Sequence, residues 1–319
     1  MRVLVTGASG FVGQAVRRDL LAAGHGVVAV TRRGGPPADT SGVTWRRLPA
    51  TSKDLAWPEL LAGVQAVIHL AGHAHAPVGD GADTLAAYRA VNVEFTSRLA
   101  AQARAAGVAR FVFVSSVKVM GERTRDAFRD ADTPAPEDAY GISKLEAETA
   151  LSTILRGSST SFTVLRPPLL YGPGVKANLR HLTRAVLAGW PLPFGRVRNQ
   201  RSFLARDNLS DLIVHCLHQA GARNATFLVS DGEDLSTPEL VRRIALADGR
   251  RARLVSVPVS VVDWTLRGVG RAGTADKLLG SLVVDSSRVR RTLAWEPPLG
   301  TDTALRAMVS EVGAMRHGR

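Results

Sequence analysis

The N-terminal part of the chain reads as a strand, a glycine-rich turn, a helix and a second strand. Residues 2–6 are an apolar run, and residues 7–13 hold three glycines. A second apolar run at 27–30 follows Gly24 and Gly26. This order predicts a βαβ unit. The apolar residues between the two runs recur at helical spacing, namely Phe11, Val12, Ala15, Val16 and Leu20.

The same alternation of apolar runs and helical patterns continues to about residue 165. We expect strands at 66–70, 110–115 and 161–165, separated by alanine-rich helices at 91–106 and 140–155. Strands that alternate with helices form parallel sheets covered on both faces. The pattern therefore predicts an α/β fold with a Rossmann-type, doubly wound parallel sheet.

The composition changes after residue 168, where proline, glycine and arginine become frequent. Turn signals stand at 172–174 and 190–193. A further helix at 208–218 and a strand at 225–229 return to the first sheet. We expect a dinucleotide-binding domain from residues 1–175 together with roughly 204–230. A smaller C-terminal substrate-binding lobe would comprise 176–203 and 231–319.

Composition narrows the class of protein. The chain has 319 residues, of which 45% are hydrophobic and 22% charged, so disorder is excluded as its main state. Cys216 is the only cysteine, which excludes intrachain disulfides and cysteine-clustered metal sites and fits a cytoplasmic protein. We see no signal peptide and no run of roughly 18 apolar residues, so we expect neither a bound metal nor membrane insertion.

The net charge of +13 is unevenly distributed. Residues 1–150 carry 17 basic and 15 acidic side chains, whereas 151–319 carry 24 and 13. Because 36 of the 41 basic residues are arginine, one interpretation is a GC-rich coding sequence. The other is a C-terminal lobe that receives a polyanionic ligand such as a diphosphate, since the planar guanidinium suits phosphate.

Gly7, Gly10 and Gly13 form a Gly-x-x-Gly-x-x-Gly turn between the first strand and the first helix. At such a place, backbone N–H groups and the helix dipole meet a pyrophosphate. Glycines alone can serve tight turns for steric reasons. Their position inside a βαβ unit favours a dinucleotide site.

The second strand ends in Thr31, Arg32 and Arg33, where an NAD-binding protein is expected to have a carboxylate for the ribose. Two guanidiniums would favour the 2′-phosphate of NADP. If they face solvent instead, NAD is the alternative.

Tyr140 and Lys144 are four residues apart and lie on one face of a predicted helix. A phenol titrates near pKa 10, and a neighbouring ammonium supports the phenolate. Ser115 and Ser116 end a predicted strand at the carboxyl edge of the sheet, where ligands of such folds bind. Singly, each residue could be an ordinary packing or capping residue, but together with the glycine turn they predict proton chemistry.

These motifs resemble those of the extended short-chain dehydrogenase/reductases of the nucleotide-sugar epimerase/dehydratase family, from one end of the chain to the other. The matching pieces are Thr6 to Gly13, His69-Leu70-Ala71, Asn92-Val93, Val114-Ser115-Ser116, Tyr140 to Lys144, Leu165-Arg166-Pro167, Tyr171 to Gly174, Arg201-Ser202-Phe203 and Asp207-Asn208-Leu209.

The resemblance implies roles for particular residues. Tyr140 is the acid/base, Lys144 lowers its pKa and holds the nicotinamide ribose, and Ser116 binds the reacting oxygen. Lys118 would contact substrate, while Asn178 and Arg201 would hold the sugar diphosphate. Asn178 could instead cap a helix at 179–187, and Arg201 could be a surface charge. The implied cofactor-binding residues are Gly7, Gly10, Phe11, Val12, Gly13, Arg32, Arg33, Leu70, Ala71, Asn92, Lys144 and Pro167, with His69 and Asn92 either structural or supporting the ribose.

Departures from the family pattern bear on the reaction. Val117 and Lys118 follow Ser116 where sugar dehydratases have Asp-Glu, so a dehydratase is not expected. Met120 replaces a tyrosine usual in UDP-hexose 4-epimerases, which weakens that alternative.

The leading hypothesis is an NADP(H)-linked 4-ketoreductase of a UDP-4-keto-6-deoxy-N-acetylhexosamine, in surface polysaccharide biosynthesis. The first alternative is a UDP-hexose 4-epimerase. The second is a non-catalytic dinucleotide-sensing protein, which would not need Ser116, Tyr140 and Lys144. We expect a UDP-sugar as partner rather than nucleic acid, and the family implies a homodimer formed through helices at 91–106 and 140–155.

Overall fold

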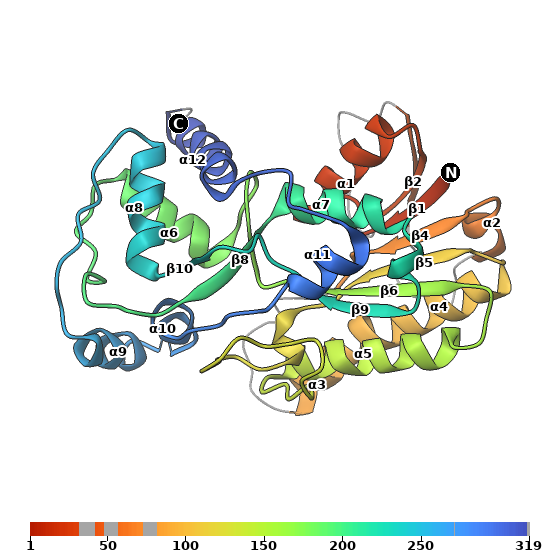
Figure 1. Cartoon of the computed structure of the whole chain (residues 1–319), viewed down its shortest axis with the longest axis horizontal. Helices are drawn as coiled ribbons and strands as arrows, with labels where there is room; N and C mark the ends of the chain where they lie inside the picture. Colours follow the sequence, from red (N-terminus) through yellow and green to blue (C-terminus); the bar gives the residue numbers. More distant parts are fainter. Residues whose placement is uncertain (32–41, 48–56, 73–81, 271, 318–319) are drawn as a thin grey trace.

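A computed structural model describes residues 1–31, 42–47, 57–72, 82–270 and 272–317. Its larger lobe is built on a seven-stranded sheet in the described residues, with all strands parallel in the order β3-β2-β1-β4-β5-β6-β9 (Figure 1). The predicted Rossmann-type fold is therefore confirmed. The strands are β1 (Arg2–Thr6), β2 (Gly26–Thr31), β3 (Val43–Arg47), β4 (Ala66–His69), β5 (Arg110–Val114), β6 (Ser161–Arg166) and β9 (Ala225–Leu228).

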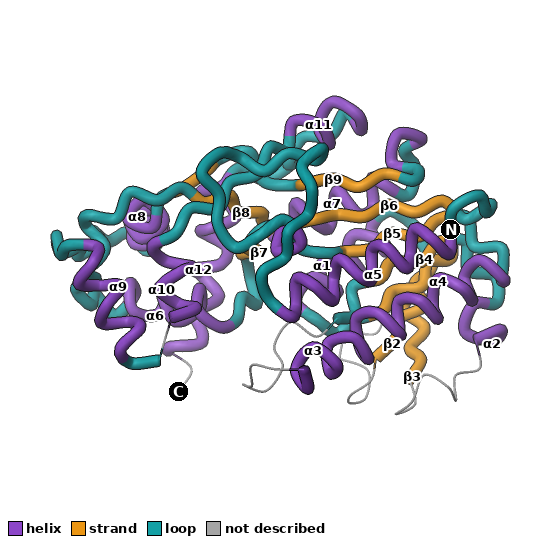
Figure 2. The backbone as a smooth tube through the Cα atoms, turned by 90° about the horizontal axis from the view of Figure 1, so that it is seen from below, coloured by secondary structure: helices purple, strands orange, loops and turns teal. Residues whose placement is uncertain are grey.

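Helices cover both faces of this sheet, because the apolar strands alternate their side chains between two cores. Val3 and Val5 of β1 face a core with helices α1 (Phe11–Ala22) and α7 (Arg206–Cys216). Leu4 faces the opposite core, with α2 (Trp57–Leu61), α4 (Phe95–Ala105) and α5 (Ala139–Leu155). Figure 2 shows the sheet between these layers.

The predicted helix at 91–106 has a different beginning in the structure. α3 (Ala82–Tyr88) leads into a π-helical segment, Arg89–Glu94, which then continues as α4. The edge strand β3 was not predicted, because its residues are mostly exposed and carry no apolar run. The helix predicted at 140–155 is confirmed as α5.

The second lobe has its own apolar core around a three-stranded sheet in the described residues, ordered β10-β8-β7. Val289 and Leu293 of α11 (Ser287–Leu293) instead join the core under β1 and α1. The two-domain division stays a proposal, and in it α11 packs against the first domain. The remaining elements are β7 (Leu169–Tyr171), β8 (Arg201–Ala205), β10 (Asp234–Leu235), α6 (Ala177–Leu187), α8 (Thr237–Ala247), α9 (Val259–Gly268), α10 (Ala272–Leu279) and α12 (Thr301–His317).

None of the described helices combines the length and apolar composition that a bilayer crossing requires.

Candidate active site

The glycine turn brings the start of α1 against the end of β4. Gly7 has a φ of +67°, and its carbonyl accepts a hydrogen bond from Gly10 N at 2.9 Å. A Cβ at Gly13 would lie 2.3 Å from that carbonyl oxygen, so only glycine fits there. Gly10 caps α1 without a side-chain hydrogen bond. The N–H groups of Phe11 and Val12 therefore begin a helix whose end has no side-chain cap, which suits a pyrophosphate.

His69 fixes the neighbouring end of β4. Its Nδ1 lies 2.6 Å from Thr6 Oγ1 and its Nε2 lies 2.8 Å from Thr96 Oγ1. Ala71 N donates to the same Thr6 hydroxyl at 3.2 Å. Burial lowers the pKa of His69 to about 3, so the ring is neutral at physiological pH. This arrangement supports the structural interpretation of His69 and holds Leu70 and Ala71 beside the glycine turn.

Ser116, Tyr140 and Lys144 come together at the carboxyl edge of β5. Ser116 begins a short 3₁₀ turn, and the N–H of the next residue donates to Pro167 O at 2.9 Å. Tyr140 lies in the first turn of α5, and the hydroxyl of Ser116 is close enough to lower the pKa of Tyr140 against the effect of burial. Lys144, one turn further, donates from Nζ to Val114 O at 2.8 Å. The structure therefore brings the three predicted catalytic residues to one site.

The protein's own groups do not lower the pKa of Tyr140. Burial raises it to about 12, the carboxylate of Asp138 adds to the rise, and the hydrogen bond from Ser116 opposes it. Burial lowers the pKa of Lys144 to about 7, opposed by Glu148. Lys144 is not among the groups that shift the pKa of Tyr140 in this arrangement, so its role in depressing that pKa stays a prediction.

Lys118 is held by two carboxylates. Its Nζ lies 2.5 Å from both Glu122 Oε1 and Asp138 Oδ2. Asp138 also caps α5 by accepting from Gly141 N at 2.6 Å. Lys118 therefore neutralises the carboxylate that raises the pKa of Tyr140, and it is not poised as a lone cation for substrate. The sequence did not suggest this cluster, because Asp138 is 20 residues away in the chain.

Asn92 supports the same helix from the π-helical segment. Its Nδ2 donates to Ser143 Oγ at 2.9 Å, and Ser143 Oγ donates to Tyr140 O at 2.8 Å. Thr96 Oγ1 donates to the carbonyl of Asn92 at 2.5 Å. This buried chain of hydrogen bonds gives Asn92 a structural role next to Tyr140.

Arg201 is buried in the second lobe, with 8% of its surface exposed, so the alternative of a surface charge is wrong. Nη1 donates to the carbonyls of Gly280 at 2.9 Å and Asp276 at 3.5 Å. Among the described residues, its Nε has no hydrogen-bond partner, and burial lowers its pKa. A buried guanidinium without a carboxylate contact is suited to an anionic ligand.

The remaining predicted residues divide into two groups. Asn178 is exposed at the start of α6, whose N-cap is Lys176, so the helix-capping alternative is wrong. No hydrogen bond joins Asn178 to Arg201 in the described part of the chain. Arg32 and Arg33 lie outside the described residues.

Lys277 of α10 was missed by the sequence analysis. Its charge interacts with those of Lys118, Glu122 and Asp138 in the first lobe and of Arg201 in the second. Loss of hydration and then repulsion by Lys118 lower its pKa. Because Lys277 is more than 130 residues from these first-lobe residues in the chain, no sequence spacing could have placed it near Lys118.

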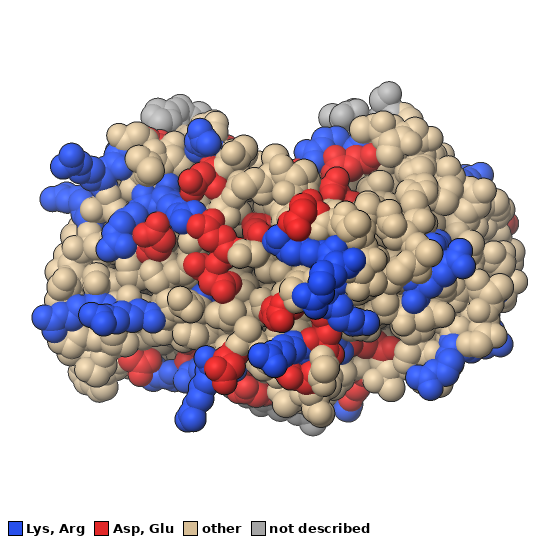
Figure 3. All heavy atoms as spheres, viewed as in Figure 1, with Lys and Arg blue, Asp and Glu red and all other residues tan. Residues whose placement is uncertain are grey.

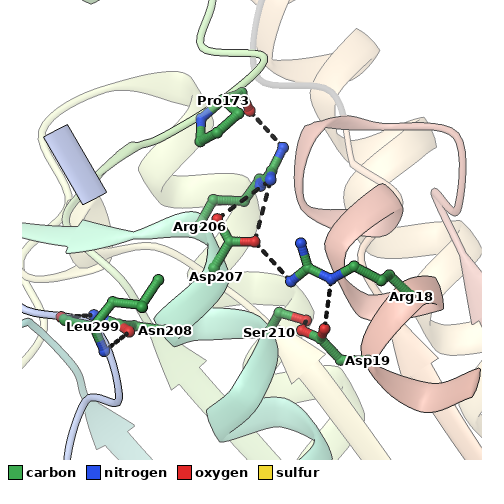
Figure 4. A network of polar contacts seen from close by, with 8 residues as sticks. All are labelled: Arg18, Asp19, Pro173, Arg206, Asp207, Asn208, Ser210 and Leu299. Carbon is green, nitrogen blue, oxygen red and sulfur yellow. Dashed lines mark hydrogen bonds and ion pairs between the residues drawn. The ribbon is translucent and has the colours of Figure 1, made fainter. Parts of the chain in front are cut away.

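A polar network joins the glycine-turn helix α1 to α7 and to the turn at 172–174 (Figure 4). Arg18 Nη2 lies 2.7 Å from Asp207 Oδ1, and Ser210 Oγ lies 2.5 Å from Asp19 Oδ2. Arg206 donates to Pro173 O at 2.5 Å, and its guanidinium carbon lies 5.6 Å from the centre of the Phe11 ring. The turn that would hold the cofactor is thereby anchored to the turn at 172–174.

Within the described ranges, no group of three or more His, Cys, Asp or Glu side chains could hold a metal ion.

Comparison with known proteins agrees with this geometry. Residues 3–230 match the model of the "NAD dependent epimerase/dehydratase family". The chain is 39% identical over 305 residues to a UDP-glucose 4-epimerase of Vibrio cholerae, covering 93% of this chain and 90% of that protein. It is 32% identical over 267 residues to a 2′-dehydrokanamycin reductase of Streptomyces kanamyceticus, covering 81% and 70%.

A solved structure is also similar. MoeE5 in complex with UDP-glucuronic acid and NAD superposes with a TM-score of 0.78 at 26% identity, covering 100% of both chains.

Proposed function

This chain is an enzyme that belongs to the NAD dependent epimerase/dehydratase family, and from that premise we propose that it is a UDP-sugar 4-epimerase. The observation that carries the proposal is the approach of the Ser116 hydroxyl to Tyr140, with Lys144 one helical turn further along α5, at the carboxyl edge of the sheet. The likeness to the V. cholerae UDP-glucose 4-epimerase over 93% of the chain supports it.

In this proposal Tyr140 takes the proton of the sugar 4-hydroxyl and later returns it. Ser116 donates a hydrogen bond to the same oxygen and holds it against the phenol. NAD, where bound, would supply the acceptor and then the donor of the hydride that carbon 4 exchanges. Gly7, Gly10 and Gly13 would hold the pyrophosphate, since the tight turn that they form leaves backbone N–H groups at the start of α1, and a side chain at Gly13 would collide with the backbone of that turn. Lys144 would donate to the nicotinamide ribose.

NAD is the proposed cofactor, in place of the NADP that Arg32 and Arg33 predicted. MoeE5, which is similar over its whole length, is described with NAD. The two arginines lie outside the described residues, so their contribution is tested directly. Titration of the enzyme with NADH and NADPH, followed by fluorescence, should give tighter binding of NADH. Tighter binding of NADPH would restore the original prediction.

Arg201 is the proposed contact for the diphosphate of the UDP-sugar. Its Nε has no partner in the described residues, and its other donors reach only backbone carbonyls. Lys277 adds a second positive charge that interacts with that of Arg201. Two cations without carboxylate ion pairs among the described residues suit the two negative charges of a diphosphate.

A 4-ketoreductase is the second candidate, favoured by the 32% identity to the 2′-dehydrokanamycin reductase. Met120 does not distinguish an epimerase from a reductase. It is 2% exposed and packs with Val119 and Leu282 in a small core cluster. Methionine in place of tyrosine at this position therefore changes the packing of the core. A non-catalytic dinucleotide-sensing protein would not need Ser116 and Tyr140 side by side, so that alternative is not favoured.

We also propose that the chain forms a homodimer through α4 and α5.

The test is a product assay with UDP-glucose, UDP-galactose and their N-acetyl forms. An epimerase converts each sugar into its 4-epimer without net consumption of NADH. A reductase consumes one NADH or NADPH for each 4-keto sugar reduced and produces no epimer from the 4-hydroxy sugars. Absence of epimer, together with stoichiometric cofactor consumption on a 4-keto sugar, would contradict the epimerase proposal.

A further inference from the structure

Exposed large apolar side chains gather in one short part of the second lobe. The described residues include nine such side chains, and five of them fall between positions 255 and 269. A scatter of single exposed apolar residues is normal, but a contiguous group marks an interaction site. The five are Val255, Val259, Val261, Trp264 and Val269.

Helix α9 exposes apolar side chains on the face that points away from the protein. Val262 is buried and Leu266 packs against the second-lobe core. Val261 and Trp264, three residues apart, share a different face and are 48% and 77% exposed. A helix that covers only one core would carry polar residues on this outer face. The outer face of α9 therefore lacks the partner that its composition requires.

A second exposed tryptophan lies on the loop beside the segment that enters α9. Leu192 N donates to Arg253 O at 2.8 Å, and Val255 N donates back to Leu192 O at 2.8 Å. Trp190, two residues before this pairing, is also exposed. We call the group Val255, Val259, Val261, Trp264, Val269 and Trp190 the α9 surface.

The surroundings of the α9 surface are basic. Arg196 and Arg198 follow the loop of Trp190, while Arg251 and Arg253 precede Val255, and all four are exposed. None of the four makes an ion pair with a carboxylate in the described part of the chain. The one acidic residue of α9, Asp263, is already paired with Arg267 at 2.9 Å. Figure 3 shows basic side chains bordering uncharged surface at the end of the second lobe where Figure 1 places α9.

We propose that the α9 surface binds the anionic surface of a lipid bilayer. Tryptophan is enriched at membrane interfaces, where its ring lies at the level of the headgroups. Arginines around an apolar helix face add electrostatic attraction to anionic lipids. At ten residues α9 is too short to cross a bilayer, so it would lie in the plane of the interface.

Charge separates this occupant from a second copy of the chain. A two-fold dimer formed through the α9 surface would place the same patch on both subunits. Its unpaired arginines would then face one another, and like charges repel. Anionic headgroups would neutralise them. This proposal goes beyond the proposed epimerase activity and does not depend on it.

The test is sedimentation of the full chain with phosphatidylcholine vesicles, with and without phosphatidylglycerol. We expect binding to the phosphatidylglycerol vesicles that weakens as salt is added. The double variant Val261→Ser, Trp264→Ser should bind at least about tenfold more weakly, since each apolar side chain withdrawn from water contributes more than about 1.4 kcal/mol. Leu246→Ser is the matched control, because Leu246 is equally exposed but lies on α8, and its binding should equal that of wild type.

Three results would overturn the proposal. The first is no sedimentation of wild type with phosphatidylglycerol vesicles at low salt. The second is equal binding by wild type and by the double variant, when both have the same melting temperature. The third is light scattering that shows a wild-type dimer and a monomeric double variant, which would assign the surface to a second copy.

Discussion

The two lobes each bury an arginine, but they treat its charge differently. Arg166 of β6 is 7% exposed, and its guanidinium contacts both carboxylate oxygens of Glu148, the shortest distance being 2.6 Å. Arg201 of β8 is 8% exposed and reaches only backbone carbonyls, with no ion pair in the described residues. A buried charge with a carboxylate partner is part of the scaffold, whereas one without such a partner is suited to a ligand.

The same distinction applies within the first lobe. Lys118 is held by two carboxylates, while Lys144 donates to a backbone carbonyl and its pKa is lowered to about 7 by burial. Lys144 and Arg201 have no direct carboxylate partner among the described residues, and the proposed mechanism assigns them to cofactor and substrate. Substituting a scaffold charge should therefore lower stability, whereas substituting a ligand-binding charge should lower affinity.

The largest effect is expected from Tyr140→Phe. The variant lacks the phenolic hydroxyl that exchanges a proton with the sugar 4-hydroxyl, but it keeps the aromatic ring. We therefore expect kcat to fall by at least about a hundredfold. Affinity for NADH and inhibition by UDP should not change. Steady-state kinetics with parallel cofactor titration measures this. Retention of more than a few per cent of the activity would contradict the acid/base assignment.

Arg166→Met should destabilise the fold without affecting the site. The change leaves Glu148 buried and unpaired, which typically costs about 3–5 kcal/mol. Urea unfolding should show this loss, with KM for the UDP-sugar as in wild type. The double variant Arg166→Met, Glu148→Leu should recover most of the stability. A loss below about 1 kcal/mol in the single variant would show that the ion pair is not a scaffold contact.

Arg201→Ala should have the opposite effect to Arg166→Met: it should impair binding of the UDP-sugar rather than the stability of the fold. Losing one hydrogen bond between a charged group and phosphate costs roughly 1.5–3 kcal/mol, so KM for a UDP-sugar should rise by roughly 10- to 150-fold. NADH binding should be unaffected. An unchanged KM, together with failure of UDP to compete in wild type, would remove the UDP-sugar assignment and leave the triad standing.

The smallest effect is expected from Lys118→Met, and it concerns pH. The pKa of Tyr140 is already raised, partly by Asp138, and loss of Lys118 leaves that carboxylate without its ammonium partner. Tyr140 should then hold its proton more tightly. The low-pH side of the profile of kcat/KM against pH should therefore move to higher pH by roughly 0.5–1 unit.

One control variant makes that result specific. Asp138→Asn keeps a cap for α5 and removes the carboxylate that raises the pKa of Tyr140. It should therefore move the low-pH side of the kcat/KM profile to lower pH. A uniform rise of KM at every pH in Lys118→Met, with no movement of that side of the profile, would instead support the original prediction that Lys118 binds substrate.

The pattern of residues along the chain is sufficient to predict the β1-α1-β2 unit, the parallel sheet and the pair Tyr140 and Lys144. These features depend on neighbours in the chain. Side chains alternate along a strand, one helical turn brings positions four apart together, and a tight turn needs glycine. Residue type and spacing are then sufficient to identify them.

Packing between distant segments, in contrast, sets the edge strand β3, the burial of Arg201, the ion pairs of Lys118 and the position of Lys277. β3 carries no apolar run that would mark it, because an edge strand is exposed. Arg201 meets α10 about 80 residues away, and Lys118 meets an acid 20 residues away. Partners this distant come together only when the chain folds into its tertiary structure, and burial then sets whether a cation is neutralised or left for a ligand.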